Sequence, residues 1–442
     1  MVAYKSSAIS PLPIVSSSSM EDLDDDLLVK ILVPGILTSQ DAFQCKLVSK
    51  HWQSLISSPF FVKSWKEFHK VDHQPLPFTL VTNLKIRSGW VDHYVISNVA
   101  TRHQLFQSKR FNLGFLPCFR RGRNGRGRRA HVRISASCND VLLCHSTLLE
   151  DMKQRVYYIC NPLTRYWVAL PAFPSSNCLS MIKGDAHVGL VCEENNYSVV
   201  RIHYGQSTGW SKSSFLAEVF SSKTQRWDVM EVSHPHDLEF FFKNYNYGYH
   251  QHNMFCWNGF LFIDNQADDT LVAYNPLEPN SCRIISKPEE GYFDHMAFGV
   301  CHGSLQLLQQ CNHDRVDIGT GYFIIWQLED LEKGEWSFKN EIFFEEFAMD
   351  ENDPLQDEIH YDQGPQIQVL SLDPNDENIV FFRHDCWHGG KDERILSCNL
   401  LTKRVKLLDS KACTGRGLRC WEPQNFFQFV IPAWPTPVPR LP

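Results

Sequence analysis

Asn161-Pro162-Leu163-Thr164-Arg165-Tyr166-Trp167, followed closely by Leu170-Pro171, indicates the fold of this 442-residue chain most directly. The pattern is a strand, a turn and a second strand, and the turn contains Asn or Ser, two further residues, Thr and a basic residue. Two more copies occur at residues 222–227 and 399–405, and fainter ones at 98–102 and 274–277. Residues 328–336 form a sixth candidate, with a turn expected to be longer. Adjacent copies lie roughly 50–70 residues apart, which is compatible with propeller blades plus insertions.

Short apolar runs surround these turns from about residue 75 to residue 430. Examples are Val141–Leu143, Gly259–Ile263, Phe323–Trp326 and Ile379–Phe382. Such runs, bounded by Gly, Asn, Pro and Ser, predict many antiparallel strands. A four-stranded blade cannot bury both its faces alone, so radial closure would supply its neighbours. We therefore predict a β-propeller over residues 75–430 with about six blades, seven also being compatible. Trp167, Trp227, Trp257 and Trp336 lie near repeat ends, where we expect them to pack between blades.

Residues 21–70 have a different, helical pattern. Five apolar residues recur at helical spacing in one stripe: Leu23, Leu27, Leu28, Ile31 and Leu32. Pro34-Gly35 predicts the end of this helix, and Pro59 is placed where the first turn of a later helix tolerates proline. A module of this size has little room for a core of its own, so a partner would cover some of its apolar side chains. The Ser-rich residues 1–20 and the Pro-rich residues 431–442 are predicted to be tails.

Composition excludes several classes of protein. The chain is 43% hydrophobic and 13% aromatic and has a net charge of −7, so it has material for a large core and is not a generally basic nucleic-acid binder. No run is long and apolar enough to cross a membrane, and residues 1–20 lack a secretory signal. The 15 cysteines include no C-x-x-C pair, which argues against a zinc site and for reduced thiols in the nucleus or cytoplasm.

The segment Leu23–Phe60 resembles an F-box, a helical module of about 40 residues. The matching residues are Leu23, Asp26-Leu27-Leu28, Ile31-Leu32, Lys46–Lys50, Trp52, Leu55-Ile56 and Pro59-Phe60. The later part resembles the F-box-associated, kelch-like propeller of plant F-box proteins through Asn161-Pro162, Leu170-Pro171, Trp227 and Trp257–Leu261. Two departures from the F-box pattern are the start Leu23-Asp24, where Leu-Pro is usual, and the loop Val33–Ile36.

This resemblance implies the substrate-recognition subunit of an SCF-type cullin-RING ubiquitin ligase. The F-box would bind a Skp-family adaptor and through it the cullin and RING subunits, and the propeller would hold an unknown target protein. Catalytic residues, metal ions and cofactors are not expected in such a receptor. The expected adaptor-binding residues are Leu23, Leu27, Leu28, Ile31, Leu32, Leu47, Val48, Trp52 and Pro59.

Two further segments suggest binding functions. Tyr245, Tyr247 and Tyr249 lie in an aromatic stretch that could contact the target from a propeller face. A Gly- and Arg-rich run could serve as a nuclear-import signal, contact RNA or be a solvated loop; its arginines are Arg120, Arg121, Arg123, Arg126, Arg128 and Arg129. The alternatives to a ligase receptor are therefore a stand-alone propeller that binds proteins and an RNA-binding protein. A propeller enzyme is a third alternative, but no sequence motif supports it.

Overall fold

A computed structural model gives the structure of the chain. It describes residues 23–37, 39–69, 78–85, 91–96, 113–119, 131–148, 151–172, 186–193, 196–203, 214–233, 254–265, 269–278, 281–288, 295–312, 321–349, 366–385, 393–409, 426–432 and 434–438. The chain divides into two compact units, Met1–Gln74 and Pro75–Pro442, and each is considered by itself.

In its described residues, the first unit contains four helices: α1 (Asp25–Gly35), α2 (Ser39–Cys45), α3 (Lys50–Ser57) and α4 (Pro59–Phe68). Serine hydroxyls define two helix starts. The Oγ of Ser49 accepts the backbone N–H of Trp52 at 3.1 Å, and the Oγ of Ser58 accepts that of Phe61 at 3.1 Å. Pro59 occupies the first turn of α4, as its position in the sequence predicted.

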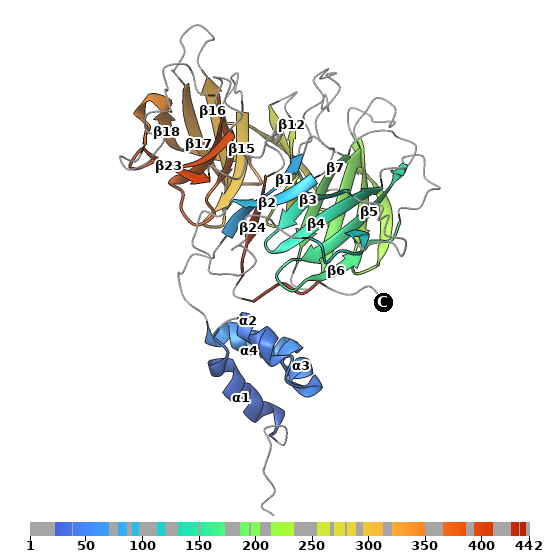
Figure 1. The fold of residues 1–442 in the computed structure, drawn as a ribbon. Coiled ribbons are helices and arrows are strands. Elements are labelled where there is room, and N and C mark those ends of the chain that lie inside the picture. The colour runs from blue at the N-terminus through green and yellow to red at the C-terminus, as the bar shows by residue number, and fades with distance from the viewer. Residues whose placement is uncertain are drawn as a thin grey trace, which may run out of the picture. The chain divides into compact units, whose positions relative to one another are not determined.

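The second unit contains six antiparallel sheets in the described residues, which we number as blades in chain order (Figure 1). Blade 1 joins β1 (Phe78–Lys85), β2 (Val91–Ile96) and β24 (Phe426–Val430). Blade 2 holds β3 (His131–Cys138), β4 (Val141–Leu148), β5 (Asp151–Asn161) and β6 (Tyr166–Ala169). Blade 3 holds β7 (Ala186–Cys192), β8 (Tyr197–His203), β9 (Ser214–Ser221) and β10 (Arg226–Ser233).

Blade 4 holds β11 (Phe255–Trp257), β12 (Phe260–Asn265), β13 (Thr270–Tyr274) and β14 (Cys282–Ser286). Blade 5 holds β15 (His295–Cys301), β16 (Ser304–Asn312), β17 (Gly321–Asp330) and β18 (Glu335–Phe343). Blade 6 holds β20 (Gln366–Leu372), β21 (Ile379–Asp385), β22 (Glu393–Asn399), β23 (Arg404–Asp409) and the short β19 (Ala348–Met349), which runs parallel to β23. Two short 3₁₀ turns complete the described elements, Pro117–Phe119 and Phe344–Glu346.

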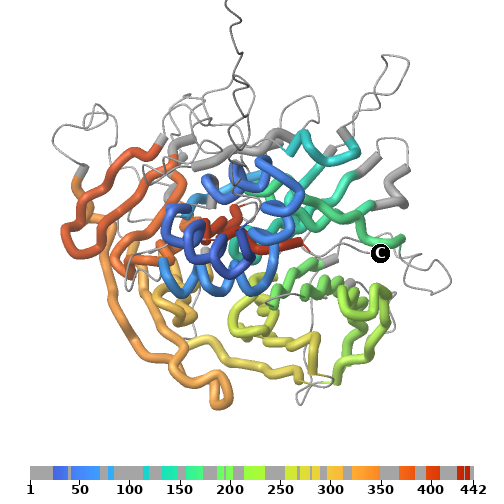
Figure 2. The backbone as a smooth tube through the Cα atoms, turned by 90° about the horizontal axis from the view of Figure 1, so that it is seen from below, coloured from blue at the N-terminus to red at the C-terminus, as the bar shows by residue number. Residues whose placement is uncertain are grey.

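The expected layout of an α-helical module followed by an all-β propeller is confirmed. Five blades contain four or five strands, and blade 1 has three among the described residues. The sheets follow one another in chain order around the ring (Figure 2). Six apolar clusters of buried residues account for this arrangement, because each lies between two consecutive blades. A blade therefore buries both its faces only against its two neighbours, as the sequence suggested.

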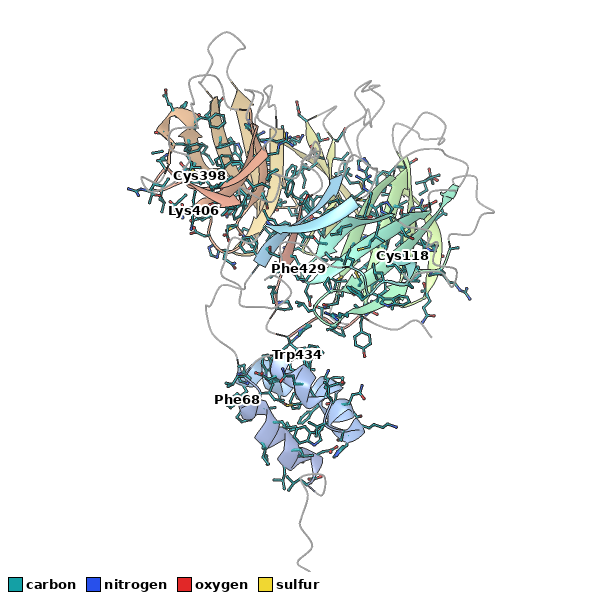
Figure 3. All side chains as sticks on the ribbon, in the orientation of Figure 1. Phe68, Cys118, Cys398, Lys406, Phe429 and Trp434 are labelled. Atoms are coloured by element: carbon teal, nitrogen blue, oxygen red, sulfur yellow. The ribbon has the colours of Figure 1, made fainter. Side chains whose placement is uncertain are left out.

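The ring closes by pairing the two ends of the propeller sequence. Leu80 of β1 lies opposite Gln428 of β24 in an antiparallel register. Phe429 of β24 is fully buried in the cluster between blades 1 and 2 (Figure 3). On the other side, Leu80 packs with Phe381 and Ile395 of blade 6. Blade 1 is thus completed by a strand from the far end of the chain.

The predicted repeat corresponds to the hairpin between the last two strands of a blade. The Asn161 side chain accepts the backbone N–H of Leu163 at 2.9 Å, and Asn399 does the same for Leu401 at 3.1 Å. The final turn residue has positive φ in the three clear copies: Arg165, Gln225 and Lys403. The sixth candidate is also a hairpin, but the expectation of a longer turn is wrong. Its turn from Asp330 to Glu335 has the same length, and Gly334 supplies the positive φ.

These hairpins lie on the same side of a blade as the turn between its first two strands, because alternate connections in an antiparallel sheet lie at the same end. We call this side the tight-turn face. It carries the β3–β4, β11–β12 and β15–β16 turns, in which Asn139, Asn258 and His302 have positive φ. In blades 2 to 6, the second strand ends and the third strand begins at the opposite face.

The C-terminal segment is packed against blade 2, which corrects the expectation of a simple Pro-rich tail after residue 430. Trp434 and Val438 are buried. A carboxylate oxygen of Asp140 accepts the backbone N–H of Thr436 at 2.8 Å and the Asn161 side-chain amide at 2.6 Å. Burial raises the pKa of Asp140, and these hydrogen bonds oppose the shift. The segment therefore behaves as part of the propeller over residues 434–438.

Candidate functional site

The helical unit has a small core of its own. Leu28 of α1, Ile56 of α3 and Phe61 of α4 have no exposed surface. The indole N–H of Trp65 donates to the carbonyl oxygen of Ile36 at 2.7 Å, which ties α4 to the end of α1. A ring nitrogen of His69 lies 2.8 Å from the carbonyl oxygen of Val33 and adds a second contact of the same kind.

Next to this core, the unit exposes large apolar side chains. Leu27 and Ile31, one helical turn apart on α1, are 49% and 46% exposed, and Leu47 in the turn after α2 is 86% exposed. Val48 and Pro59 are exposed as well. Phe68, which ends α4, is another exposed aromatic residue of this unit (Figure 3). We call Leu27, Ile31, Leu47, Val48 and Pro59 the exposed apolar set.

The structure therefore divides the nine residues expected to bind an adaptor. Leu28, Leu32 and Trp52 are buried inside the helical unit, which corrects their expected role as contact residues. Leu23 is half-buried. The single stripe expected on α1 is in fact two, because residues one apart on a helix differ in direction by about 100°.

The two departures from the F-box pattern have different structural consequences. Asp24 is exposed and precedes α1; its carbonyl oxygen accepts the backbone N–H of Leu28 at 2.9 Å, while its side chain makes no capping hydrogen bond. Val33 and Ile36 are buried core residues. Of the two departures, the one at Asp24 therefore lies on the surface, whereas Val33 and Ile36 belong to the packing of the unit.

In the propeller, the tryptophans fasten neighbouring blades, as expected. The indole N–H of Trp227 on β10 donates to the carbonyl oxygen of Pro171, which follows the last strand of blade 2, at 2.9 Å. Trp336 on β18 donates to Ser286, the last residue of β14, also at 2.9 Å. Trp257 donates to Gly303 of blade 5 at 2.9 Å. These contacts are structural.

Two ion pairs in the propeller are largely buried. Arg201 and Glu218 approach to 3.0 Å within blade 3, and Lys287 and Asp264 to 2.7 Å within blade 4. The guanidinium of Arg201 also lies over the Tyr157 ring of blade 2, with 5.4 Å to the ring centroid. Buried ion pairs of this kind hold neighbouring strands and blades together, so their burial by itself indicates no catalytic role.

The cysteines and the remaining candidate sites are located as follows. The eleven described cysteines are free thiols, and five of them are buried. Within the described residues, no group of three or more His, Cys, Asp or Glu is arranged to hold a metal ion. None of the helices described is long and apolar enough to cross a bilayer. Tyr245, Tyr247 and Tyr249 and the six arginines of residues 120–129 lie outside the described residues.

The comparison with protein families agrees with this architecture. Residues 123–440 match the family described as F-box protein At3g26010-like, beta-propeller. The chain belongs to this family. It is a plant-type F-box protein whose second unit is the family's propeller, as the resemblance in the sequence implied.

A curated relative is similar to the chain over most of its length. This F-box propeller chain is 27% identical to F-box protein At5g49610 of Arabidopsis thaliana over 330 residues, which is 72% of this chain and 78% of the relative. Solved structures are more distant. A puromycin-hydrolyzing peptidase of Mycobacterium tuberculosis shares 11% identity at a TM-score of 0.35, over 63% of this chain and 38% of the peptidase. A chain of a nidogen/laminin complex shares 9% identity at a TM-score of 0.35, over 80% of this chain and 99% of that one.

Proposed function

We propose that this chain is the substrate-recognition subunit of an SCF-type cullin-RING ubiquitin ligase. The helical unit binds a Skp-family adaptor, which connects it to the cullin and RING subunits, and the propeller binds the protein to be ubiquitinated. The chain performs no chemistry itself. It raises the effective concentration of a target lysine near the charged ubiquitin-conjugating enzyme. We place this activity in the nucleus or cytoplasm.

The observation that carries the proposal is the exposed apolar set. The core of the helical unit is already filled by other side chains, among them Leu28 and Ile56, so Leu27, Ile31 and Leu47 have no packing role that would explain them. Exposure of several large apolar residues on a small unit is typical of a protein that a partner covers. The family to which the chain belongs has the F-box in its description.

The estimated free energies are compatible with a stable complex, provided that further contacts add to those of the exposed apolar set. Complete burial of a large apolar side chain contributes about 1.5–3 kcal/mol. The five residues of the exposed apolar set, two of which are already half-covered, would contribute roughly 5–10 kcal/mol. Association costs about 4–15 kcal/mol, so polar contacts at the rim would supply the remainder.

The first prediction concerns adaptor binding by the full chain. We expect the double variant Leu27→Asp/Ile31→Asp to lose at least 100-fold in affinity for a Skp-family adaptor, because two carboxylates would be desolvated in the interface. Both side chains are about half exposed, so the fold should survive. Affinity is measured by titration with purified adaptor, and folding by circular dichroism and thermal unfolding.

Two variants serve as controls. Gln53→Asp adds charge at an exposed site of α3 outside the exposed apolar set and should keep adaptor binding. Leu28→Asp places a charge in the core and should melt the helical unit. Absence of adaptor binding by the unmodified chain would refute the proposal and leave a stand-alone propeller. Unchanged binding by the double variant would refute the role of this surface.

A further inference from the structure

Blade 5 extends beyond the neighbouring blade 4 towards the face opposite the tight turns. Trp336, the second residue of β18, donates its indole N–H to Ser286, the last residue of β14, at 2.9 Å. Both strands run from the tight-turn face to the opposite face. Since β14 ends where β18 has only begun, the rest of β18 has no outer strand of blade 4 beside it within the described residues.

The register of the β17–β18 hairpin places three residue pairs on the side facing blade 4. Tyr322 lies opposite Phe343, Ile324 opposite Glu341, and Trp326 opposite Phe338. A register shift between Ile325 and Trp326 keeps Phe338 on the same side as Glu341, although three positions separate them in the sequence. Leu328 and Trp336 on this side pack against blade 4. The three pairs lie on the same side of the hairpin, beyond Leu328 and Trp336 and towards the face opposite the tight turns.

Aromatic rings lie along the outer part of this side of the β17–β18 hairpin. Phe338 is 56% exposed and lies edge-on to Trp326, with ring centroids 5.6 Å apart. Phe343 is 41% exposed and lies 5.7 Å from the Tyr322 ring. We call these four rings, with Glu341 between the two ring pairs, the aromatic strip.

The charge of Glu341 is available at the centre of the strip. Its side chain is exposed, and within the described part of the chain no cation forms an ion pair with it. Residues 321–349 contain seven Asp and Glu against two Lys, so the surroundings of the strip are acidic. A cationic partner is favoured at such a place, both by the carboxylate and by the negative faces of the aromatic rings.

We propose that the aromatic strip binds an extended segment of the target that carries Lys or Arg between two apolar side chains. The cation would pair with Glu341, and the apolar side chains would cover the Trp326–Phe338 and Tyr322–Phe343 pairs. Tyr322 and Trp326 are four residues apart on β17, which is about 13 Å in a strand. The pattern apolar-x-basic-x-apolar in an extended chain spans the same distance. This inference rests on the proposed function, in which the propeller holds the target.

The edge of blade 5 suits an extended partner. β18 is the last strand of its sheet, so one side of its backbone is not paired within that sheet. Addition of a strand to such an edge supplies backbone hydrogen bonds, while alternate side chains supply specificity. The strands β2, β6, β10 and β14 also end their sheets, whereas β23 is paired with the short parallel strand β19. Among the described side chains of these outer strands, only those of β18 include exposed rings in pairs around a carboxylate; on β10 the large exposed apolar residue is Val229 alone.

The experiment uses two labelled peptides and the full chain. One has the sequence Thr-Leu-Thr-Arg-Thr-Leu-Thr, and the matched one has Glu in place of Arg. Fluorescence anisotropy titrations at low ionic strength should show at least tenfold tighter binding of the Arg peptide. Glu341→Lys should reverse the order of the two peptides, since it exchanges the sign of the charge. Phe338→Ser should weaken both, and Val229→Ser, a matched change on the outer strand of blade 3, should weaken neither.

The outcomes separate this inference from the proposed function. Equal affinity for both peptides, failure of the Arg peptide to bind, or an order unchanged by Glu341→Lys would overturn the strip as a binding surface. Adaptor binding is measured on the same variants and should be unaffected, because Glu341 and Phe338 lie in the propeller unit. Loss of adaptor binding by the unmodified chain would instead be a failure of the proposed function.

Discussion

At the scale of single residues, environment changes the chemistry that the sequence alone would assign. Asp373 follows β20 on the tight-turn face and is almost completely buried. Burial raises its pKa from 3.8 to about 6, although the backbone N–H of Asn375 donates to its Oδ1 at 2.8 Å. Asp376 adds to the increase and His302 opposes it. The carboxylate form is therefore less favoured in the folded protein than in the unfolded chain.

This predicts a pH dependence of stability with a definite sign. Because the folded state holds the proton of Asp373 more tightly than the unfolded state, stability decreases as pH rises from about 3.8 to about 6. Asp373→Asn keeps the acceptor for Asn375 and removes the charge, so it should stabilise the protein by about 1–2 kcal/mol at pH 7. This gain should vanish below pH 4 in denaturant unfolding measured across pH. A variant less stable than the wild type at pH 7 would contradict the assignment.

Also at this scale, two adjacent residues of the same type can have different roles. Leu27 and Leu28 are identical in type and adjacent in sequence, yet one is half exposed and the other is completely buried. A substitution at Leu28 would therefore report on folding, and one at Leu27 would report on binding. Sequence periodicity found the apolar stripe but could not divide it, because the division depends on where α3 and α4 pack.

At the scale of elements, each blade depends on its neighbours through a few directed contacts. The N–H of Trp227 spans the interface between blades 2 and 3, and its ring lies near the Arg201 guanidinium, 5.9 Å from the ring centroid. The central strands of this region are buried on both faces, as in β9. A hydrogen bond at the outer strand therefore fixes a blade whose contact with blade 2 is mainly apolar.

We expect Trp227→Phe to lower the free energy of unfolding by about 1–3 kcal/mol, because the carbonyl oxygen of Pro171 loses its donor. Val229→Ala, an exposed position of the same strand, should change it by less than about 0.5 kcal/mol. Denaturant unfolding of both variants tests the difference. Equal effects would mean that the indole hydrogen bond contributes nothing to the blade interface.

At the scale of the whole molecule, closure of the ring depends on the last described strand. β24 pairs with β1, and Phe427 and Phe429 fill the interface to blade 2. After β24, the segment 434–438 adds the hydrogen bonds to Asp140. The strand and the segment make separable contributions, since the first closes a sheet and the second covers blade 2 and its interface with blade 3.

Two truncations should separate these contributions. A chain that ends at residue 425 lacks β24 and should be expanded and prone to aggregation, because both faces beside blade 1 lose apolar cover. A chain that ends at residue 432 keeps the closing strand and should remain compact, with faster hydrogen exchange confined to blade 2. Size-exclusion chromatography and hydrogen exchange measure both. Similar compactness of the two chains would contradict closure by β24.

The sequence by itself determined the elements and their class. Local rules were enough, because Asn161, Ser58 and Pro59 act on backbone groups within a few residues and because apolar alternation is read along the chain. The F-box resemblance and the propeller followed from such local patterns. The number of strands in blade 1 did not follow, since one of them comes from residues 426–430 at the other end of the propeller.

Only the tertiary structure decided which side chains are available to partners. It buried Leu28, Leu32 and Trp52 and left Leu27, Ile31 and Leu47 exposed. It also brought Phe338 and Glu341 to one side through a register shift, which no simple alternation predicts. The physical reason is the same in both cases. The exposure of a side chain depends on which segments, distant in sequence, pack over it. The pattern of residues along one segment does not show this packing.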